Sequence, residues 1–328
     1  MSNTTLRLAV IGCGGIAQAY LQALRQVPEL ELTSAIDVYR PRAEAAIGDS
    51  GARTFDSVEA MLAEAPCDAA LVLTPPNTHE SVSVRLLQSG VHVLCEKPLT
   101  TTTQSAMRML QAAAASRRLL MMGSKFRYTP DMVKAHDLLA QGLIGDPLLF
   151  ENVFCARVDM TRRWNSVRSI SGGGVLLDNG CHSVDIARYL LGPIEHVQAQ
   201  FAKPVQPLEV EDTARLLFES QGGTMGSVDL SWSLHKEVPS YVRIYGAKGT
   251  LEIGWKVSRY KLDGDRDWTV FGNGYDKIGA FRAQLANFAA AIRGREAPLI
   301  NEVDALASVQ VIEAAYRSAQ APKWHELG

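Results

Sequence analysis

A glycine-rich segment near the start of the chain has the residue types and spacing that bind a dinucleotide. Residues 12–17 read Gly-Cys-Gly-Gly-Ile-Ala, the pattern G-x-G-x-x-A, and they follow a short apolar run over residues 6–11. In this pattern Gly12 permits the tight turn, Gly14 lets the backbone approach a pyrophosphate, and Ala17 keeps the next helix close to the strand. The helix that begins here offers free N–H groups and its positive dipole end to the phosphates. The segment therefore predicts a strand, a glycine turn and a helix that hold a dinucleotide.

An acidic residue follows the second predicted strand where such a site needs one. The strand over residues 30–36 ends at Asp37, twenty-five residues after Gly12. A carboxylate there can accept both ribose hydroxyls of the adenosine half, and it would repel a 2′-phosphate, which favours NAD over NADP. Arg40 and Arg42 lie just beyond it. Because an arginine can accommodate the 2′-phosphate, NADP stays the alternative cofactor.

Another buried strand, predicted over residues 68–73, also ends in polar residues. Residues 74–79 read Thr-Pro-Pro-Asn-Thr-His, and the two prolines stop the strand in an extended turn. Ligands bind at the carboxyl ends of parallel strands, so Thr74, Asn77 and His79 are candidate cofactor contacts. A capped turn without a ligand is the alternative interpretation for His79.

A charged pair ends the next strand. The run over residues 92–95 is followed by Glu96, Lys97 and Pro98. The pair is expected in the same crevice as the glycine turn, and a cis peptide bond at Pro98 would aim the Lys97 side chain. An ion pair that only closes the strand is the alternative.

A segment in the second half brings a histidine and carboxylates together. After three consecutive glycines, the sequence predicts one helix over residues 175–191, in which Asp178 and His182 share a face and Asp185 lies near it. Gly180 inside a helix costs about 1 kcal/mol relative to alanine, which makes sense if a ligand approaches the backbone there. The alternative is a surface or core histidine paired with a carboxylate. No metal is expected, because the local spacing offers no third ligand.

The bulk composition excludes several classes of protein. The formal net charge of −2 over 328 residues, without a basic run, argues against nucleic-acid binding. No apolar run reaches the roughly 20 residues that span a bilayer, and the short polar N-terminus is not expected to act as a signal peptide. The five scattered cysteines are expected to be reduced thiols without structural zinc. We therefore expect a cytoplasmic protein that contacts neither membranes nor nucleic acid.

The order of elements predicts two domains. Strands and helices alternate in the first part, which favours a doubly wound parallel sheet, the Rossmann arrangement, over residues 1–123. The regular alternation of strands and helices ends at Gly123, and residues 124–328 are expected to form an α+β domain with a mostly antiparallel sheet. Its strands are predicted over residues 148–158, 197–203, 212–219, 224–233, 238–246 and 249–253, with helices over residues 130–141, 280–293 and 303–319.

Together, the glycine turn, residues 96–98 and residues 178–182 with Asp185 resemble the glucose–fructose oxidoreductase, inositol dehydrogenase and rhizopine-catabolism family (Gfo/Idh/MocA). The resemblance covers nearly the whole chain. It implies a Rossmann domain followed by an α+β domain whose open sheet often serves as an oligomer interface, so a homodimer or homotetramer is expected. It also implies a nicotinamide cofactor and a sugar, inositol or related polyol as substrate.

The resemblance also implies roles for individual residues. The catalytic set would be Lys97, Asp178 and His182. The cofactor would be lined by Gly12, Cys13, Gly14, Gly15, Ile16, Asp37, Arg42, Thr74, Pro75, Asn77, His79, Glu96 and Lys97. The substrate would contact Lys97, Lys125, Arg127, Trp164, Asp178, Asn179 and His182. Residues 124–128 read Ser-Lys-Phe-Arg-Tyr where the family often has an asparagine and an arginine, so specificity can differ here.

The implied reaction suits these residue types. Oxidation of a secondary alcohol moves a hydride to the nicotinamide while the hydroxyl loses a proton. His182, with an ordinary pKa of about 6.5, can act as the base, and Lys97 can stabilise negative charge on the reacting oxygen. Neither half of the chain supplies all three groups, so a site between the domains is expected. The alternatives are a redox-neutral enzyme that uses NAD to cleave a glycosidic bond, a reductase of a non-sugar substrate, and a non-catalytic NAD-binding regulator that senses sugars.

Overall fold

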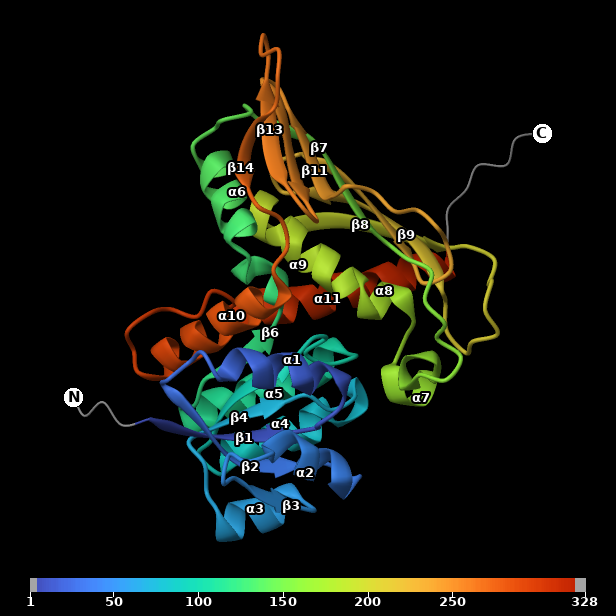
Figure 1. Ribbon diagram of the computed structural model, residues 1–328. Coiled ribbons are helices and arrows are strands. Elements are labelled where there is room, and N and C mark those ends of the chain that lie inside the picture. Colours follow the sequence, from blue (N-terminus) through green and yellow to red (C-terminus); the bar gives the residue numbers. More distant parts are fainter. Residues whose placement is uncertain (1–4, 322–328) are drawn as a thin grey trace. The chain divides into compact units, whose positions relative to one another are not determined.

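The computed structural model describes residues 5–321 (Figure 1). The contacts within the chain divide it into two compact units. The first unit is made of two segments, the chain up to Tyr128 and Asp276–Leu306. The second unit is made of Thr129–Tyr275 and the residues from Ala307 on. This grouping differs from the predicted division at residues 123/124, because a late segment of the chain packs with the first unit.

The first unit is built on a six-stranded parallel sheet. Its strands are β1 (Leu6–Ile11), β2 (Leu30–Ile36), β3 (Arg53–Phe55), β4 (Ala69–Val72), β5 (His92–Glu96) and β6 (Leu120–Gly123). Their order is β3-β2-β1-β4-β5-β6, which confirms the predicted doubly wound Rossmann sheet. The middle strands are buried on both faces, as the continuous apolar run of β1 requires.

Helices cover this sheet, and one of them comes from late in the sequence. The helical segments of the first unit are α1 (Gly15–Leu24), α2 (Arg40–Ile47), α3 (Val58–Glu64), the 3₁₀ turn η1 (Pro76–Thr78), α4 (His79–Gln88), α5 (Thr103–Ser116), η2 (Lys125–Tyr128) and α10 (Lys277–Ile292). In α10, Phe281, Leu285 and Phe288 are fully buried in the same core as Tyr20 of α1. This apolar stripe is why α10 belongs to the first unit.

The second unit is built on an eight-stranded sheet. Its strands are β7 (Pro147–Cys155), β8 (Ile194–Phe201), β9 (Thr213–Ser220), β10 (Met225–Ser231), β11 (Ser240–Gly246), β12 (Gly249–Gly254), β13 (Ser258–Leu262) and β14 (Thr269–Gly272). They are ordered β14-β13-β12-β11-β7-β10-β9-β8. The β7–β10 pair is parallel and the other pairs are antiparallel, so the predicted mostly antiparallel sheet is confirmed.

Among the described residues, helices lie on one face of this sheet and the other face is open. The remaining helical segments are α6 (Pro130–Ala140), η3 (Trp164–Ser166), α7 (Arg168–Ser171), α8 (Val175–Asp178), α9 (Gly180–Leu191) and α11 (Glu302–Gln320). In Figure 1, α6, α8 and α9 lie along one side of the sheet. Strand β9 shows the consequence, because Leu216 and Phe218 are buried while Arg215, Leu217 and Glu219 are exposed.

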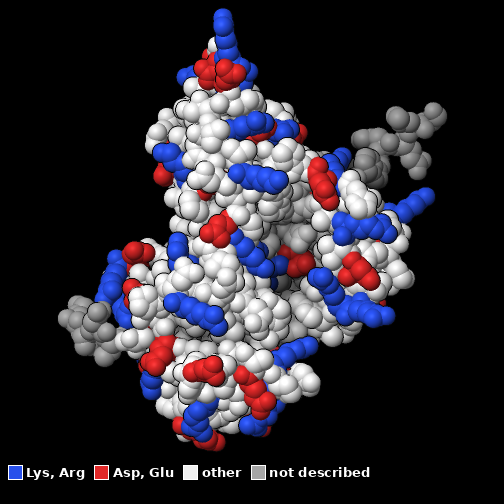
Figure 2. Space-filling model, in the orientation of Figure 1, with Lys and Arg blue, Asp and Glu red and all other residues white. Residues whose placement is uncertain are grey.

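The charge distribution on the surface and the lengths of the helices relate to binding of nucleic acid and of membranes. On the face shown in Figure 2, acidic and basic side chains are interspersed rather than separated by sign. Within residues 5–321, every helix is too short or too polar to cross a bilayer.

Candidate functional site

The turn after β1 needs a glycine for the fold itself. Gly12 has a φ of +89°, and a Cβ placed on it would lie 2.8 Å from main-chain atoms of Leu73 and Thr74. That neighbouring backbone continues β4, which pairs with β1, and the N–H of Leu73 donates to the carbonyl of Ile11 at 2.8 Å. It therefore cannot move away to make room.

The next two glycines are not required by the fold. Gly14 has an extended backbone that any residue can adopt (φ −74°, ψ −163°), and a Cβ on Gly14 or Gly15 would meet no atom of the described residues within 4 Å. Within residues 5–321, no side chain caps α1, which begins at Gly15, and the first turn of α1 holds no acidic residue. An open surface of main-chain N–H groups at a helix start fits a pyrophosphate, so these residues suit a dinucleotide.

Asp37 joins the end of β2 to the glycine turn. Its Oδ2 accepts a hydrogen bond from the N–H of Cys13 at 2.8 Å, and its Oδ1 accepts one from the N–H of Tyr39 at 2.8 Å. Each carboxylate oxygen can accept a second hydrogen bond, so Asp37 retains acceptor capacity for ribose hydroxyls. The sequence placed Asp37 near this turn but did not reveal its direct bond to it.

The two arginines beyond Asp37 have different surroundings. Arg40 pairs with Glu44 at 3.1 Å and with Asp56 at 3.4 Å. The guanidinium of Arg42 lies over the ring of Tyr39, 5.7 Å from its centroid, on an exposed surface. Arg42 is therefore the arginine better placed to meet a 2′-phosphate, and its predicted cofactor contact stays a prediction.

The segment after β4 is tied to the segment after β5 by His79. The Nε2 of His79 lies 2.8 Å from the carbonyl oxygen of Thr74, and Nδ1 lies 2.9 Å from that of Pro98. The ring is buried, and that burial lowers the pKa of His79 although the carbonyls oppose the effect. His79 thus connects two loops, and its predicted cofactor contact stays a prediction. Asn77 is exposed and Pro75 is partly exposed.

The carboxylate of the charged pair after β5 is bound by the main chain and by helix α1. Oε2 of Glu96 accepts a hydrogen bond from the main-chain N–H of Lys97 at 3.0 Å, and Oε1 accepts one from the hydroxyl of Tyr20 at 2.7 Å. The Lys97–Pro98 peptide bond is cis. Glu96 is buried and Lys97 is partly exposed.

These segments meet because of the strand order. Strands β2, β1, β4, β5 and β6 are adjacent and parallel, so their carboxyl ends lie at one edge of the sheet. Neighbouring strands are about 4.8 Å apart, which puts the backbone of Lys97 about 10 Å from the glycine turn, two strands away. A bound dinucleotide is long enough to reach from one to the other.

Residues 124–128 follow β6 and mostly serve the core of the first unit. Arg127 is buried, and its Nη1 pairs with Oδ2 of Asp304 at 2.9 Å and donates to the carbonyl of Leu299 at 3.3 Å. Lys125 is partly exposed, and its Nζ lies 4.8 Å from the centroid of the Phe126 ring. Of the two predicted substrate contacts here, Arg127 thus also has a structural partner.

The predicted single helix over residues 175–191 is two helices. α8 ends at Asp178, and α9 starts at Gly180. The carbonyl of Asp178 accepts a hydrogen bond from the thiol of Cys181 at 3.2 Å, and the N–H of His182 donates to the carbonyl of Asn179 at 3.1 Å. Because the helix is interrupted, the four-residue spacing no longer shows that Asp178 and His182 share a face.

The prediction that Gly180 leaves room for a ligand is also wrong. A Cβ on Gly180 would lie 3.1 Å from side-chain atoms of Leu176 and Leu230, and 3.4 Å from Ile312. Gly180 therefore lets α9 pack closely against β10 and α11. His182 in the next turn is buried, whereas Asp178 and Asn179 are partly exposed.

Gly174, the last glycine before α8, contacts the side chain of Glu211, a residue that the sequence analysis did not identify. Oε1 of Glu211 accepts hydrogen bonds from the N–H groups of Gly174 at 3.0 Å and Leu176 at 3.1 Å, and from the hydroxyl of Tyr316 at 2.6 Å. A Cβ on Gly173 would overlap the Tyr316 hydroxyl, and one on Gly174 would overlap the Glu211 carbonyl. Glu211 and Tyr316 thus fix the start of the segment that carries Asp178. Burial raises the pKa of Glu211.

The predicted substrate contact Trp164 has an exposed side chain. Trp164 lies in η3 and is 42% exposed, so its ring is available to a ligand. Within residues 5–321, no three His, Cys, Asp or Glu side chains come together as a metal-binding group.

Comparisons with known proteins agree with this geometry. Residues 6–124 match the model of GFO_IDH_MocA, an oxidoreductase family with an NAD-binding Rossmann fold, and residues 132–252 match the GFO/IDH/MocA C-terminal domain. D-apiose dehydrogenase of Paraburkholderia graminis is 26% identical over 97% of this chain and 89% of its own. Inositol 2-dehydrogenase of Rhizobium meliloti is 26% identical over 96% of this chain and 97% of its own. The solved structure of GenD2 from gentamicin A biosynthesis, in complex with NAD, is 26% identical with a TM-score of 0.86, covering 97% of this chain and 95% of that one.

Proposed function

The chain belongs to the GFO/IDH/MocA oxidoreductase family, and we propose that it interconverts a secondary alcohol and a ketone on a sugar, an inositol or a related polyol. The observation that carries this proposal is the sheet edge where Lys97 follows β5, two strands from the glycine turn that suits a dinucleotide. The names of two relatives that match nearly the whole chain supply the substrate class.

In the proposed reaction, NAD held at the glycine turn would supply the acceptor for the hydride that leaves the alcohol carbon. His182 would accept the hydroxyl proton, and the ammonium of Lys97 would donate a hydrogen bond to the same oxygen as negative charge develops on it. Asp178 would accept a hydrogen bond from the imidazole or from a neighbouring hydroxyl. Lys125, Trp164 and Asn179 remain proposed substrate contacts.

The proposal is tested by absorbance at 340 nm with NAD and NADP in parallel. The panel contains inositols, aldoses and aminosugars, and the full chain is used because Lys97 and His182 belong to different units. We expect the absorbance at 340 nm to rise, as NADH forms, with NAD and one class of polyol. Lys97→Ala and His182→Ala should each lower kcat at least about 100-fold while NAD binding, measured by titration calorimetry, stays within about threefold. The exposed Lys134→Ala is the matched control.

The alternatives give different results in the same assays. Full turnover by His182→Ala would reject the assigned base. Release of a sugar from a glycoside without net NADH, by protein that retains its NAD, would indicate the redox-neutral enzyme. Reduction of a non-sugar carbonyl compound by NADH, with every sugar inactive, would indicate the non-sugar reductase. Binding of NAD and a sugar without turnover in either direction would indicate the regulator.

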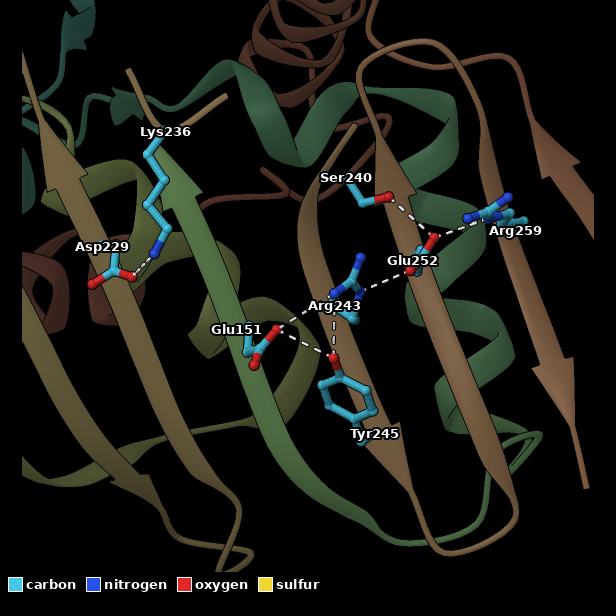
Figure 3. Close-up of polar contacts among 8 residues, drawn as sticks. All are labelled: Glu151, Asp229, Lys236, Ser240, Arg243, Tyr245, Glu252 and Arg259. Carbon is cyan, nitrogen blue, oxygen red and sulfur yellow. Dashed lines mark hydrogen bonds and ion pairs between the residues drawn. The ribbon is translucent and has the colours of Figure 1, made fainter. Parts of the chain in front are cut away.

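We also propose that the open face of the eight-stranded sheet pairs two copies of the chain in a homodimer or homotetramer. A row of alternating charges crosses this face, from Glu151 through Arg243 and Glu252 to Arg259 (Figure 3). Arg243 and Arg259 bind opposite oxygens of Glu252 at 2.7 and 2.9 Å, which leaves its side chain 4% exposed. Charges that are already paired can be covered by a second copy at a smaller desolvation cost.

Exposed apolar side chains lie on the same face. Leu149 pairs with Met225 across β7 and β10, and Leu217 lies opposite Ser227, which pairs with Glu151. These three apolar residues are 44 to 61% exposed. Light scattering after size exclusion should give the mass of two or four chains, and Leu149→Asp with Leu217→Asp should reduce it. Val205→Asp, at an exposed site outside the strands, is the control. A monomeric wild type would contradict the proposal.

The state of the cysteines relates to the cellular compartment of the protein. All five are free thiols, and four of them are buried. Free thiols are typical of proteins in a reducing compartment, so we place the protein in the cytoplasm. Alkylation of unfolded protein from cells, under conditions that trap disulfides, should label all five.

A further inference from the structure

A buried chain of hydrogen bonds runs from α10 through α1 to the residue before Lys97. The Nε2 of Gln284 donates to the hydroxyl oxygen of Tyr20 at 2.7 Å. That hydroxyl donates to Oε1 of Glu96 at 2.7 Å, and Oε2 of Glu96 accepts from the main-chain N–H of Lys97 at 3.0 Å. Tyr20 and Gln284 are completely buried, and Glu96 is 7% exposed.

The direction of these bonds follows from the chemistry of the groups. An ionised carboxylate only accepts, so Tyr20 must donate to Glu96, and its oxygen is then left to accept from Gln284. Burial, followed by the nearby charge of Glu96, raises the pKa of Tyr20 well above its usual range, so the phenol keeps its proton. Among the described residues, Oε1 of Gln284 is buried without a hydrogen-bond partner, so no competing bond orients the amide.

The surrounding packing is shaped for this chain of bonds. A Cβ on Gly123 of β6 would lie 2.8 Å from the Tyr20 hydroxyl and 3.3 Å from Cα of Glu96. The ring of Tyr20 packs on Phe281 of α10, with the centroids 4.3 Å apart. Glycine on β6 and the aromatic contact therefore hold the phenol in one place, between α10 and β5.

We propose that Tyr20 and Gln284 are positioning residues for Lys97. They hold the Glu96 carboxylate in the orientation that binds the Lys97 N–H, and so fix the point from which the Lys97 side chain reaches the reacting oxygen. This inference rests on the proposed function of Lys97. Neither Tyr20 nor Gln284 needs to touch the substrate or the cofactor, because both act through Glu96.

The first test needs no substrate and uses hydrogen–deuterium exchange of the full chain. In Tyr20→Phe, we expect amides in peptides over residues 94–100 to exchange about tenfold faster, since Glu96 loses a charged hydrogen bond. Tyr128→Phe is the matched control, because Tyr128 also donates to a residue of α10, Asn287, at 3.1 Å. Unchanged exchange near Lys97 in Tyr20→Phe, or an equal increase in both variants, would overturn the proposal.

The second test measures kinetics with the substrate found in the absorbance assay. Tyr20→Phe should lower kcat about 10- to 100-fold and leave the substrate KM within about threefold, and Gln284→Leu should do the same to a smaller extent. Combined with Glu96→Gln, Tyr20→Phe should add almost nothing, because both act on one group. Multiplicative effects, or a kcat loss no greater than that of Tyr128→Phe, would refute the positioning role. Full activity of Lys97→Ala would instead reject the proposed function, independently of the exchange result.

Discussion

The main-chain N–H of Cys13 donates a hydrogen bond of 2.8 Å to Oδ2 of Asp37. The first residue after Gly12 is thereby attached to the residue that follows the neighbouring strand. The carboxylate therefore has two tasks: it holds the shape of the glycine turn, and it presents a negative charge where the adenosine ribose is expected.

Asp37→Ala should change both stability and cofactor binding, whereas substitution of an ordinary surface acid should change neither. Loss of the two N–H contacts should lower the free energy of unfolding by about 1–3 kcal/mol. NAD affinity should fall at least about tenfold, and the preference for NAD over NADP should shrink, since the charge that repels a 2′-phosphate is gone. Titration calorimetry with both cofactors measures this. Asp49→Ala, at an exposed acid outside the turn, should change neither. An unchanged cofactor preference in Asp37→Ala would contradict the assignment.

The two glycines of the turn should respond differently to alanine. Gly12→Ala forces a side chain into φ +89° and against the backbone of Leu73 and Thr74, so it should destabilise the protein by at least about 2 kcal/mol. In Gly14→Ala the new methyl group meets no atom of the part of the chain that the structure describes within 4 Å, so the variant should unfold at the wild-type urea concentration. It should nevertheless weaken NAD binding at least about tenfold, because its methyl group stands where the pyrophosphate approaches. Wild-type NAD affinity in Gly14→Ala would show that the cofactor does not approach there.

Local signals explain why the start of the chain could be predicted well. The apolar run over residues 6–11, the glycines and the strand over residues 30–36 each show their type within a few residues. Strands β13 and β14 gave no such signal. Strand β13 carries Arg259 and Lys261 near the edge of the sheet, where neither face needs a regular apolar pattern. Strand β14 is only four residues long.

Long-range contacts explain what the sequence hid in the candidate site. Residues 175–191 read as one helix from their apolar spacing, but they form α8 and α9, and the start of α8 is held by Glu211 and Tyr316, which are distant in sequence. Tyr20 and Gln284 stand among apolar residues of two helices, and only the fold shows that the Tyr20 hydroxyl joins Gln284 to Glu96. Residue types at strand ends could be read from the sequence, but their partners could not.

Arg127 can be tested for a substrate role independently of its structural one. Arg127→Met removes the cation from the buried pair with Asp304, which should cost about 3 kcal/mol of unfolding free energy. Adding Asp304→Leu should recover at least half of that loss, because two apolar residues can replace a buried ion pair. If Arg127 acts only in the core, the double variant should also recover the substrate KM. A KM that stays raised in a restored, stable double variant would support the predicted substrate contact.

His92 should make the stability of the first unit depend on pH. Its Nδ1 accepts a hydrogen bond from the N–H of Leu119 at 2.9 Å, which only a neutral imidazole can do. Burial, followed by the charge of Arg118, lowers the pKa of His92 to about 4. Between about pH 6.5 and 4 the unfolded chain binds a proton that the folded chain does not, so stability should fall as the pH falls.

The size of that effect can be isolated by substitution. Because His92 is partly exposed, solvent screening should reduce its contribution to about 1–2 kcal/mol between pH 7 and pH 4.5. His92→Asn keeps an oxygen that can accept from Leu119 and removes the titration. Urea unfolding at both pH values should therefore show a smaller loss of stability for His92→Asn than for the wild type. The exposed His235→Asn should follow the wild type. Equal losses in all three proteins would mean that His92 does not titrate with unfolding, and that other groups cause the acid sensitivity.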